Sequence, residues 1–437
     1  MPDSRSISFG PELHATRGGP TDPAHDERLR RGIIDTNVKP STAFALVVAF
    51  LLAIYAVPLS QVVMERLEHE PSSLRGLVTR TPTSEHLRDF EKELEEASYP
   101  KNYVQPRVQL WLSRFGRAGN QRAVIGHDGW LYYTPGITHL AGPSFLDTAA
   151  QREREQAASD DDATQPLRAD PLPAIFEFAD LLGQRGIRLV LFPVPDKAMV
   201  QPYALHGRGS AQPSAVARNL GWRSFVERLR AHGVLLFDPT PARISRSDAP
   251  RFLVQDTHWT PRWMESVADQ LARFVERSVQ LPKPAAALTQ RRVSQHIERV
   301  GDLVDMLKLP EDQKLFRAQR VTVHQVQDGE GELWASDPDA DVLLLGDSFT
   351  NVFTLDRMEW GEAAGLGPQL SFALGRAVDV IAQNDSGAFA TRQALMRRLA
   401  RGADRLAGKR VVIWEFASRE LSVGDWKLFD AEKGEPR

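Results

Sequence analysis

The chain has 437 residues, of which 42% are hydrophobic and 25% charged, and its formal net charge is −3. This apolar fraction is enough to build a sizeable core, which excludes wholesale disorder, and the near-neutral charge gives no electrostatic footprint for nucleic acid. The chain contains no cysteine, which excludes thiol nucleophiles, disulfide frameworks, iron–sulfur clusters and zinc held by cysteine.

A long uncharged apolar segment lies near the N-terminus. Residues 1–40 are polar and mixed in charge, which is typical of a disordered tail. No residue from Pro40 to Met64 is charged, and residues 41–63 supply the roughly 20 residues that a membrane-spanning helix needs. We therefore expect a single transmembrane anchor at 41–63. A buried core helix and a cleaved signal peptide are the alternatives, and the lengths of the segment and of the preceding tail disfavour them.

The charges on either side of this segment predict its orientation. Four basic residues precede it closely, namely Arg28, Arg30, Arg31 and Lys39. The residues that follow it bring less positive charge, so the positive-inside rule places the tail in the cytoplasm and the large C-terminal part outside. The charged helical pattern at 64–105 then predicts a membrane-proximal stalk with a solvated face.

A hairpin and a polar insertion are expected before the main part of the fold. The β-prone runs 123–126 and 130–133 are separated by His127-Asp128-Gly129, and Asp-Gly between such runs predicts a hairpin turn. Residues 141–172 are rich in Ala, Asp, Gln and Pro, which predicts a surface loop or a polar helical insertion.

From residue 172 onward, helical patterns alternate with buried strands. Each strand is a continuous apolar run with a helical pattern before it, as expected for a mostly parallel sheet covered on both faces. The expected helices are 172–184 and 213–232, and the expected strands are 187–194, 234–237, 342–345, 378–381 and 411–416. The sequence therefore predicts the α/β fold class and one large domain at 106–437.

The strand at 342–345 leads into Gly346-Asp347-Ser348, the first candidate catalytic feature. In open α/β sheets, catalytic groups gather at the carboxyl ends of strands. Glycine permits a sharp turn, and a serine two residues later is exposed above the sheet with its own N–H available to an oxyanion. The alternative is that Asp347 or Ser348 only caps the helix that follows.

The second candidate feature is Asp256-Thr257-His258, which follows another apolar run. In an extended segment residues i and i+2 point to the same side, so Asp256 is expected beside His258, fixing its tautomer and stabilising the imidazolium. A serine hydroxyl needs such a base before it becomes a nucleophile. A structural surface histidine is the alternative for His258 alone. Together with Ser348, the pair supplies nucleophile, base and orienting carboxylate.

Motifs of other catalytic classes are absent from the sequence. It contains no G-x-S-x-G, no H-E-x-x-H, no Walker loop and no G-x-G-x-x-G. The first absence disfavours the ordinary α/β-hydrolase elbow, and the others leave metal or nucleotide chemistry without support. We therefore expect neither a metal nor a cofactor.

The two candidate features together resemble a known family. GDSF at 346–349 is similar to the nucleophile block of SGNH (GDSL-type) esterases, although most of those enzymes place serine first and Asp-x-x-His last. The order Asp, His, Ser resembles the alginate O-acetyltransferase family of the AlgJ/AlgX type, which has a permuted SGNH-like domain. The matching stretches are GHDGWLYY (126–133), FPVPDKAMVQPYAL (192–205), QDTHWTP (255–261), GDLVDML (301–307), LLLGDSFTN (343–351) and VVIWEFASREL (411–421).

This resemblance implies a fold, an activity and roles for three residues. The fold would be SGNH-hydrolase-like, and the activity would be O-acetyl transfer to hydroxyls of an exported polysaccharide. Ser348 would accept the acetyl group, His258 would act as general base, and Asp256 would orient it. The N-terminal anchor is similar to that of the AlgJ-like branch, which implies a bacterial inner-membrane protein with its catalytic domain in the periplasm.

Three further residues are weaker candidates. Asn384, which follows the strand at 378–381, is the candidate second oxyanion donor beside the Ser348 N–H; a turn-forming asparagine is the alternative. Trp259 is a candidate for stacking on a sugar, with a core position as the alternative. Arg376 is a candidate for binding an acidic sugar, with a helix cap as the alternative.

Three functions follow from these features. An anchored O-acetyltransferase implies a polysaccharide acceptor, a multi-pass membrane O-acyltransferase as acetyl donor, and other proteins of exopolysaccharide export and modification as partners. A carbohydrate acetylesterase would use the same triad with water as acceptor. A non-catalytic scaffold of an export complex would keep only the fold. The anchor and the permuted order favour transfer, and the intact triad disfavours a scaffold.

Overall fold

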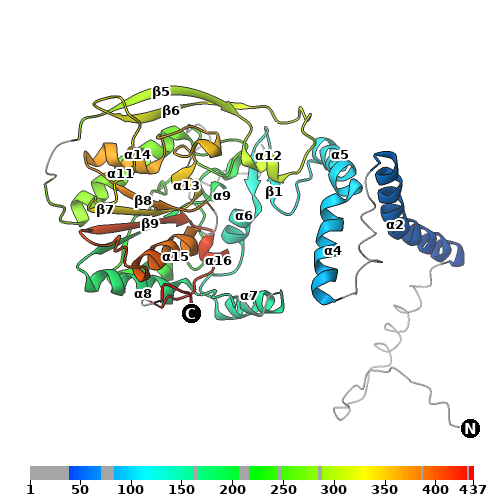
Figure 1. Cartoon of the computed structure of the whole chain (residues 1–437), viewed down its shortest axis with the longest axis horizontal. Coiled ribbons are helices and arrows are strands. Elements are labelled where there is room, and N and C mark those ends of the chain that lie inside the picture. The colour runs from blue at the N-terminus through cyan, green and yellow to red at the C-terminus, as the bar shows by residue number, and fades with distance from the viewer. Residues whose placement is uncertain are drawn as a thin grey trace, which may run out of the picture. The chain divides into compact units, whose positions relative to one another are not determined.

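The computed structural model describes residues 39–69, 83–161, 166–205, 216–244, 249–283, 288–384, 387–430 and 433–437 (Figure 1). The chain divides into two compact units, Met1–Val104 and Gln105–Arg437. All but the last two residues of the expected tail at 1–40 lie outside the described residues. The second unit begins one residue before position 106, and the division into a stalk and a catalytic domain stays a prediction.

The described residues of the first unit, 39–69 and 83–104, are mainly helical. The helices are α2 (Pro40–Leu67), α4 (Ser84–Ala97) and the π-helical turn η1 (Pro100–Val104). An 18-residue window of α2 has a mean hydropathy of 2.4 and none of it is buried, so α2 is long and apolar enough to cross a membrane. Gln61 of α2 accepts a hydrogen bond from the backbone N–H of Tyr99 (2.7 Å) and donates one to the carbonyl of Ala97 (3.0 Å). These two bonds attach α2 to the end of α4.

The second unit is built on a five-stranded sheet in which every neighbouring pair of strands is parallel. The strands are β3 (Arg188–Val194), β4 (Leu235–Leu236), β7 (Val342–Gly346), β8 (Asp379–Ala382) and β9 (Val411–Ala417). Their order is β4-β3-β9-β7-β8, so the strand that comes last in the chain is central. The mostly parallel sheet expected from the apolar runs is confirmed.

Alternate residues of these strands face two separate cores, because side chains along a strand point to opposite faces. Phe192 and Ile413 belong to the core that contains α11 and α14, whereas Leu191 and Trp414 belong to the core that contains α8, α10 and α15. Helices therefore cover both faces of the sheet (Figure 1). These helices are α8 (Pro171–Gln184), α10 (Trp222–Ala231), α11 (Pro261–Ser278), α14 (Leu366–Leu374) and α15 (Gly387–Ala400).

Two antiparallel pairs lie outside the main sheet. The expected hairpin is present as β1 (Ala123–Ile125) and β2 (Leu131–Tyr133), with Asp128 (φ 56°) and Gly129 (φ 80°) at its tip. These positive φ values are what a tight two-residue hairpin turn requires, which explains the Asp-Gly sequence. The ribbon of β5 (Gln290–Arg299) and β6 (Gln319–Asp328) lies over α11 and α14 (Figure 1).

The remaining elements are short connecting helices. They are α5 (Gln105–Trp111), η2 (Leu112–Gly116), α6 (Thr134–Ala141), α7 (Thr148–Asp161), α9 (Lys197–Val200), η3 (Pro202–Ala204), α12 (Asp302–Met306), α13 (Ser348–Asn351), η4 (Asp356–Met358) and α16 (Glu420–Val423). The helical form of the polar insertion is present as α7. The α5–η2 segment and the β5–β6 ribbon were not predicted.

The expected helix at 213–232 was wrong at its N-terminal end. Residues 216–221 are not helical, and α10 begins at Trp222; residues 213–215 lie outside the described residues. The side chain of Asn219 causes the difference. It accepts a hydrogen bond from the backbone of Gly221 (2.8 Å) and donates one to the carbonyl of His139 (2.6 Å), which holds the chain in a turn.

Substitution of the buried Trp414 on the central strand measures how much packing against this sheet contributes to the free energy of unfolding. The ring of Trp414 lies 5.4 Å from that of Phe178 and 5.7 Å from that of Trp426, and it has no exposed surface. We expect Trp414→Ala to lower the free energy of unfolding by about 3–5 kcal/mol. Trp111→Ala, at a side chain that is 61% exposed, is the matched control and should change it by less than about 0.5 kcal/mol. Denaturant unfolding checks both, and equal effects would contradict the prediction.

Candidate active site

Ser348 stands at the start of a short helix at the carboxyl end of β7, and it is half-buried. Asp347 caps this helix, because its Oδ1 accepts the backbone N–H of Phe349 (2.8 Å). Its Oδ2 accepts the backbone N–H of Ala417 at the end of β9 (2.8 Å). The aspartate thus ties the serine turn to the neighbouring strand. Asp347 therefore does cap the helix, as the alternative interpretation of the sequence predicted, and the serine is accessible as well.

A second buried carboxyl lies beneath the same turn. Glu415 Oε2 accepts the backbone N–H of Asp347 (2.9 Å) and the hydroxyl of Thr350 (2.7 Å). A Cβ added at Gly346 would lie 2.1 Å from Thr350 Oγ1 and 3.0 Å from Glu415 Oε2, so glycine is required there. Burial, together with the negative charge of Asp347, raises the pKa of Glu415 well above its ordinary value. This shift favours the protonated, neutral form of Glu415.

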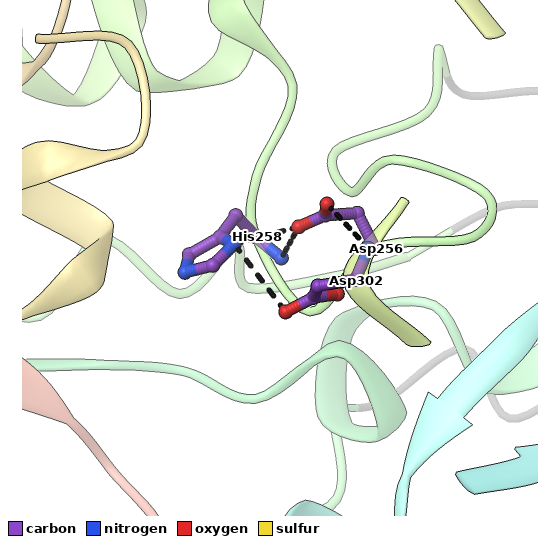
Figure 2. Close-up of side chains that lie close together, drawn as sticks. All are labelled: Asp256, His258 and Asp302. Atoms are coloured by element: carbon purple, nitrogen blue, oxygen red, sulfur yellow. Dashed lines mark hydrogen bonds and ion pairs between the residues drawn. The ribbon is translucent and has the colours of Figure 1, made fainter. Parts of the chain in front are cut away.

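Asp256 and His258 are in direct contact, as their spacing predicted (Figure 2). Asp256 Oδ1 accepts hydrogen bonds from His258 Nδ1 (2.6 Å) and from the His258 backbone (3.0 Å). Its Oδ2 accepts from Trp360 Nε1 (2.9 Å) and from the backbone of Asp302 (3.1 Å). Because Nδ1 is the donor, Nε2 is the ring nitrogen that can accept a proton.

The imidazole of His258 lies beside the serine turn. Its ring centroid is 4.9 Å from that of Phe349, the residue directly after Ser348, in an edge-to-face arrangement. His258 Nε2 is buried and has no hydrogen-bond partner among the described residues. A buried polar atom without a partner is unusual in a folded protein. This nitrogen is therefore available to a hydroxyl that approaches it.

Asp256 and His258 shift each other's pKa in opposite directions. Burial alone would raise the pKa of Asp256, but the charge of His258 and hydrogen bonds from His258 and Asp302 outweigh burial and hold that pKa below its ordinary value. Burial would likewise lower the pKa of His258, but the carboxylates of Asp256, Asp302 and Asp347 outweigh burial and raise it. Asp256 therefore stays ionised at neutral pH, and the imidazole is a stronger base than a free histidine.

Asp302 is a second carboxyl close to the imidazole (Figure 2). It is half-buried, with one oxygen 3.9 Å from His258 Nδ1, and it accepts hydrogen bonds from the backbone (2.8 Å) and the hydroxyl (2.6 Å) of Thr257. Burial and the charge of Asp256 raise its pKa to about 6. It is therefore ionised at neutral pH and adds negative charge beside the histidine.

Asp256, His258 and Asp302 also form a set of donors that could hold a metal ion, since one ligand atom from each lies within 4.8 Å of the others. Their hydrogen bonds fit a different use. Nδ1 cannot ligate a metal while it carries the hydrogen that it donates to Asp256, and both oxygens of Asp256 already accept hydrogen bonds. The donor set suits proton transfer better than metal binding.

A buried lysine holds the loop that carries Asp256. Lys197 Nζ donates to the carbonyl oxygens of Leu131 (2.6 Å), Val254 (2.9 Å) and Asp256 (3.1 Å). Burial lowers its pKa to about 7. The lysine thus joins the hairpin strand β2 to the segment of the candidate base.

Of the three weaker candidates, one lies beside the serine helix, one is buried in the core next to the site, and one lies away from the site. Asn384 Oδ1 accepts a hydrogen bond from Asn351 on the serine helix (2.7 Å), so Asn384 lies beside that helix. Trp259 is fully buried among aromatic rings, 5.3 Å from the ring of Phe349, and a sugar cannot stack on it. Its assignment to substrate was wrong, because the same alternation that points His258 to the site points Trp259 into the core.

The assignment of Arg376 to substrate binding was also wrong. Its guanidinium donates to Asp341 (2.6 Å) and to the carbonyl of Pro282 (2.8 Å). Asp341 lies at the amino end of β7 and Ser348 at its carboxyl end, so Arg376 is at the opposite end of the strands from Ser348. It connects loops there and takes no part in the site.

Several residues of the site were missed from the sequence. Asp302 and Lys197 lie inside stretches that match the family, GDLVDML and FPVPDKAMVQPYAL, and that match was the available signal. Glu415 also lies in such a stretch, as a lone charge inside an apolar strand. Trp360 follows η4 in an irregular segment, and no motif marks it.

Comparison with known proteins identifies the family. Residues 123–418 match the family described as the SGNH hydrolase-like domain of the acetyltransferase AlgX. The chain belongs to this family. The matched range contains the hairpin, all five strands of the main sheet and the residues of the site described above, from Lys197 to Glu415.

Similar proteins of this AlgX-domain family come from pseudomonads. A probable alginate O-acetylase AlgJ of Pseudomonas aeruginosa PAO1 is 27% identical over 361 residues, which cover 77% of this chain and 81% of that protein. One of Pseudomonas putida KT2440 is 28% identical over 324 residues, covering 72% and 74%. The solved O-acetyltransferase domain of Pseudomonas putida AlgJ is 24% identical, with a TM-score of 0.49, and covers 69% of this chain and 93% of that one.

In this AlgX-family domain, Glu415 can be tested with two substitutions. Glu415→Gln keeps the shape of the side chain and mimics the protonated form that the raised pKa favours, so it should change stability little. Glu415→Ala leaves the N–H of Asp347 and the hydroxyl of Thr350 buried without partners, at about 1–3 kcal/mol for each group. Thermal unfolding of the two variants beside the wild type checks this. Gln as damaging as Ala would mean that the glutamate acts as an anion.

Proposed function

We propose that the protein is a membrane-anchored O-acetyltransferase that moves acetyl groups onto hydroxyls of an exported polysaccharide, through an acetyl-serine intermediate. The observation that carries the proposal is the partnerless Nε2 of His258, fixed by Asp256 and packed against the residue that follows Ser348. Membership of an acetyltransferase family supports the same chemistry. The names of the AlgJ relatives make an alginate-like polysaccharide the first acceptor to test.

In the first half-reaction, Ser348 takes the acetyl group. His258 Nε2 removes the hydroxyl proton while Ser348 Oγ bonds to the acetyl carbonyl carbon, and the carbonyl oxygen becomes an oxyanion. When the intermediate collapses, the bond to the leaving group of the donor breaks, and the imidazolium returns the proton to that group. Asp256 stays ionised throughout and stabilises the imidazolium.

The oxyanion would be held by two donors. The N–H of Ser348 is at the first position of α13, where a helix leaves its N–H groups without partners inside the helix. The bond from Asn351 uses the Oδ1 of Asn384 and leaves the Nδ2 hydrogens of Asn384 for another acceptor. Asn384 is therefore our proposed second donor.

In the second half-reaction, a sugar hydroxyl replaces the leaving group. His258 takes the proton of that hydroxyl as its oxygen attacks the acetyl-serine, and then returns the proton to Ser348 Oγ. If water attacks instead, the same groups produce an acetylesterase. The catalytic set is common to both reactions, so the acceptor experiment below separates them.

The proposed organisation has four parts along the chain. It consists of a cytoplasmic tail at 1–40, a transmembrane anchor at 41–63, a stalk at 64–105 and the acetyltransferase domain at 106–437. The exposed apolar helix α2 supports the anchor. An anchor in the bacterial inner membrane would place the domain in the periplasm, where acetyl-CoA is absent, so a multi-pass membrane O-acyltransferase is the proposed donor, alongside other proteins of exopolysaccharide export and modification.

The first experiment measures transfer directly. The full chain in detergent is incubated with p-nitrophenyl acetate, with and without an acceptor oligosaccharide, and acetylated sugar is detected by mass spectrometry. Ser348→Ala should reduce the rate by roughly 10³-fold or more, since a nucleophile is lost. The exposed Ser294→Ala is the matched control and should keep the wild-type rate. Activity that survives Ser348→Ala would reject the proposed nucleophile, and acetate release with no acetylated sugar would favour an esterase.

The second experiment tests His258 as the base through the pH dependence. The base must be neutral, so the rate should rise with pH through the raised pKa of His258. Asp302→Asn removes one of the charges that raise this pKa, and the acidic limb of the rate profile should therefore move to lower pH. Asp305→Asn, on the same helix but with a largely exposed side chain, is the control and should leave the limb in place. An unmoved limb in Asp302→Asn would assign it to another group.

A further inference from the structure

The helical segment at 105–116, formed by α5 and η2, exposes its apolar side chains. Trp111 is 61% exposed and Phe115 67% exposed, and Val108 (50%) and Leu112 (37%) lie beside them. These positions are three and four residues apart, so the four side chains form one stripe along the helix. We call this stripe the 105–116 face.

Two polar residues of the same segment, Gln109 and Ser113, lie on its inner side together with the half-buried Leu110. Ser113 is its only buried residue among those described. Gln109 Nε2 donates to Ser113 Oγ (3.1 Å) and to the carbonyl of Ala118 (3.0 Å), and Ser113 Oγ donates to that same carbonyl (3.1 Å). A surface helix of a globular domain normally has the opposite arrangement, with apolar residues inward. The 105–116 face is therefore built to contact something other than water.

The charges beside this face indicate what it contacts. Arg107 and Arg114 are seven residues apart, on one side of the stripe, whereas Arg117, directly after the segment, donates to His127 (3.0 Å) and to the carbonyl of Gly126 (2.8 Å). A helix with Trp, Phe and Leu on one face and arginines at its margin is typical of helices that lie in the interface of a bilayer, where arginines meet anionic lipid headgroups. Only the 37 residues from Glu68 to Val104 separate the segment from α2.

We propose that the 105–116 face lies in the headgroup region of the same membrane that α2 spans. This inference rests on the membrane anchoring proposed above, and it adds a second membrane contact that belongs to the catalytic unit itself. A tether alone leaves the domain free to turn, whereas a partly inserted helix limits the directions in which the serine turn faces.

The absence of cysteine allows a direct test in the full chain. Single cysteines are placed by Trp111→Cys, Phe115→Cys, Leu220→Cys and, within α2, Leu51→Cys. Each is labelled with a fluorophore in vesicles of phosphatidylcholine and phosphatidylglycerol that contain a nitroxide lipid, with the nitroxide near the headgroup in one series and deep in the bilayer in another. Leu220 is the matched control, because it is an apolar side chain of the same unit that is 81% exposed.

We expect the headgroup nitroxide to quench the labels at 111 and 115 several-fold more than the label at 220, and the deep nitroxide to quench the label at 51. Adding Phe115→Asp to the Trp111→Cys variant should lower the quenching at 111 without changing the rate with p-nitrophenyl acetate in detergent.

Two results would overturn the inference while the anchor stands. One is quenching at 111 and 115 no stronger than at 220, with the label at 51 quenched. The other is energy transfer between labels at 111 on separate chains at high lipid dilution, because the face would then hold a second copy. An unquenched label at 51 would instead reject the anchor, and with it this inference.

Discussion

The carboxylate of Asp256 is buried, and its two oxygens accept four hydrogen bonds. The arrangement of the site depends on these four bonds. An ionised carboxylate inside a protein is costly unless it is paired and hydrogen-bonded. Here the donors come from His258, Trp360 and the start of α12, so the charge holds three separate segments together. The same bonds fix the imidazole tautomer and leave Nε2 without a hydrogen-bond partner among the described residues.

A different set of interactions holds the serine turn in place. Asp347 caps the serine helix and Glu415 lies beneath it, so the two carboxyls share the end of the sheet. Burial and the charge of Asp347 raise the pKa of Glu415, and its protonated form reduces the repulsion between the two groups. The close packing beneath the turn leaves no room for a side chain at position 346, which therefore has to be glycine. Strand end, cap and buried acid together make the turn rigid before any substrate arrives.

The features that the sequence predicted depend on residues close together in the chain. The features that it missed depend on contacts between residues far apart in the chain. Apolar runs predicted the five strands because both faces of a parallel sheet are buried, and Asp256 and His258 could be paired because they are two residues apart. Trp360 and Glu415 reach the site only through tertiary packing, so spacing could not reveal them. The ribbon β5–β6 is largely exposed and polar and offers no apolar run. Trp259 was misplaced because an aromatic residue beside a motif has the same pattern whether it faces substrate or core.

The central place of β9 has a consequence for how the chain matures. β9 lies between β3 and β7, so neither of those strands has its inner neighbour until residue 417 is available. A nascent chain in which β9 has not yet formed therefore presents two unpaired strand edges, and both cores lack the side chains of their central strand. The sheet therefore closes only when β9 inserts between β3 and β7, so the two halves that flank it form one folded unit late, although both flanking strands are made earlier.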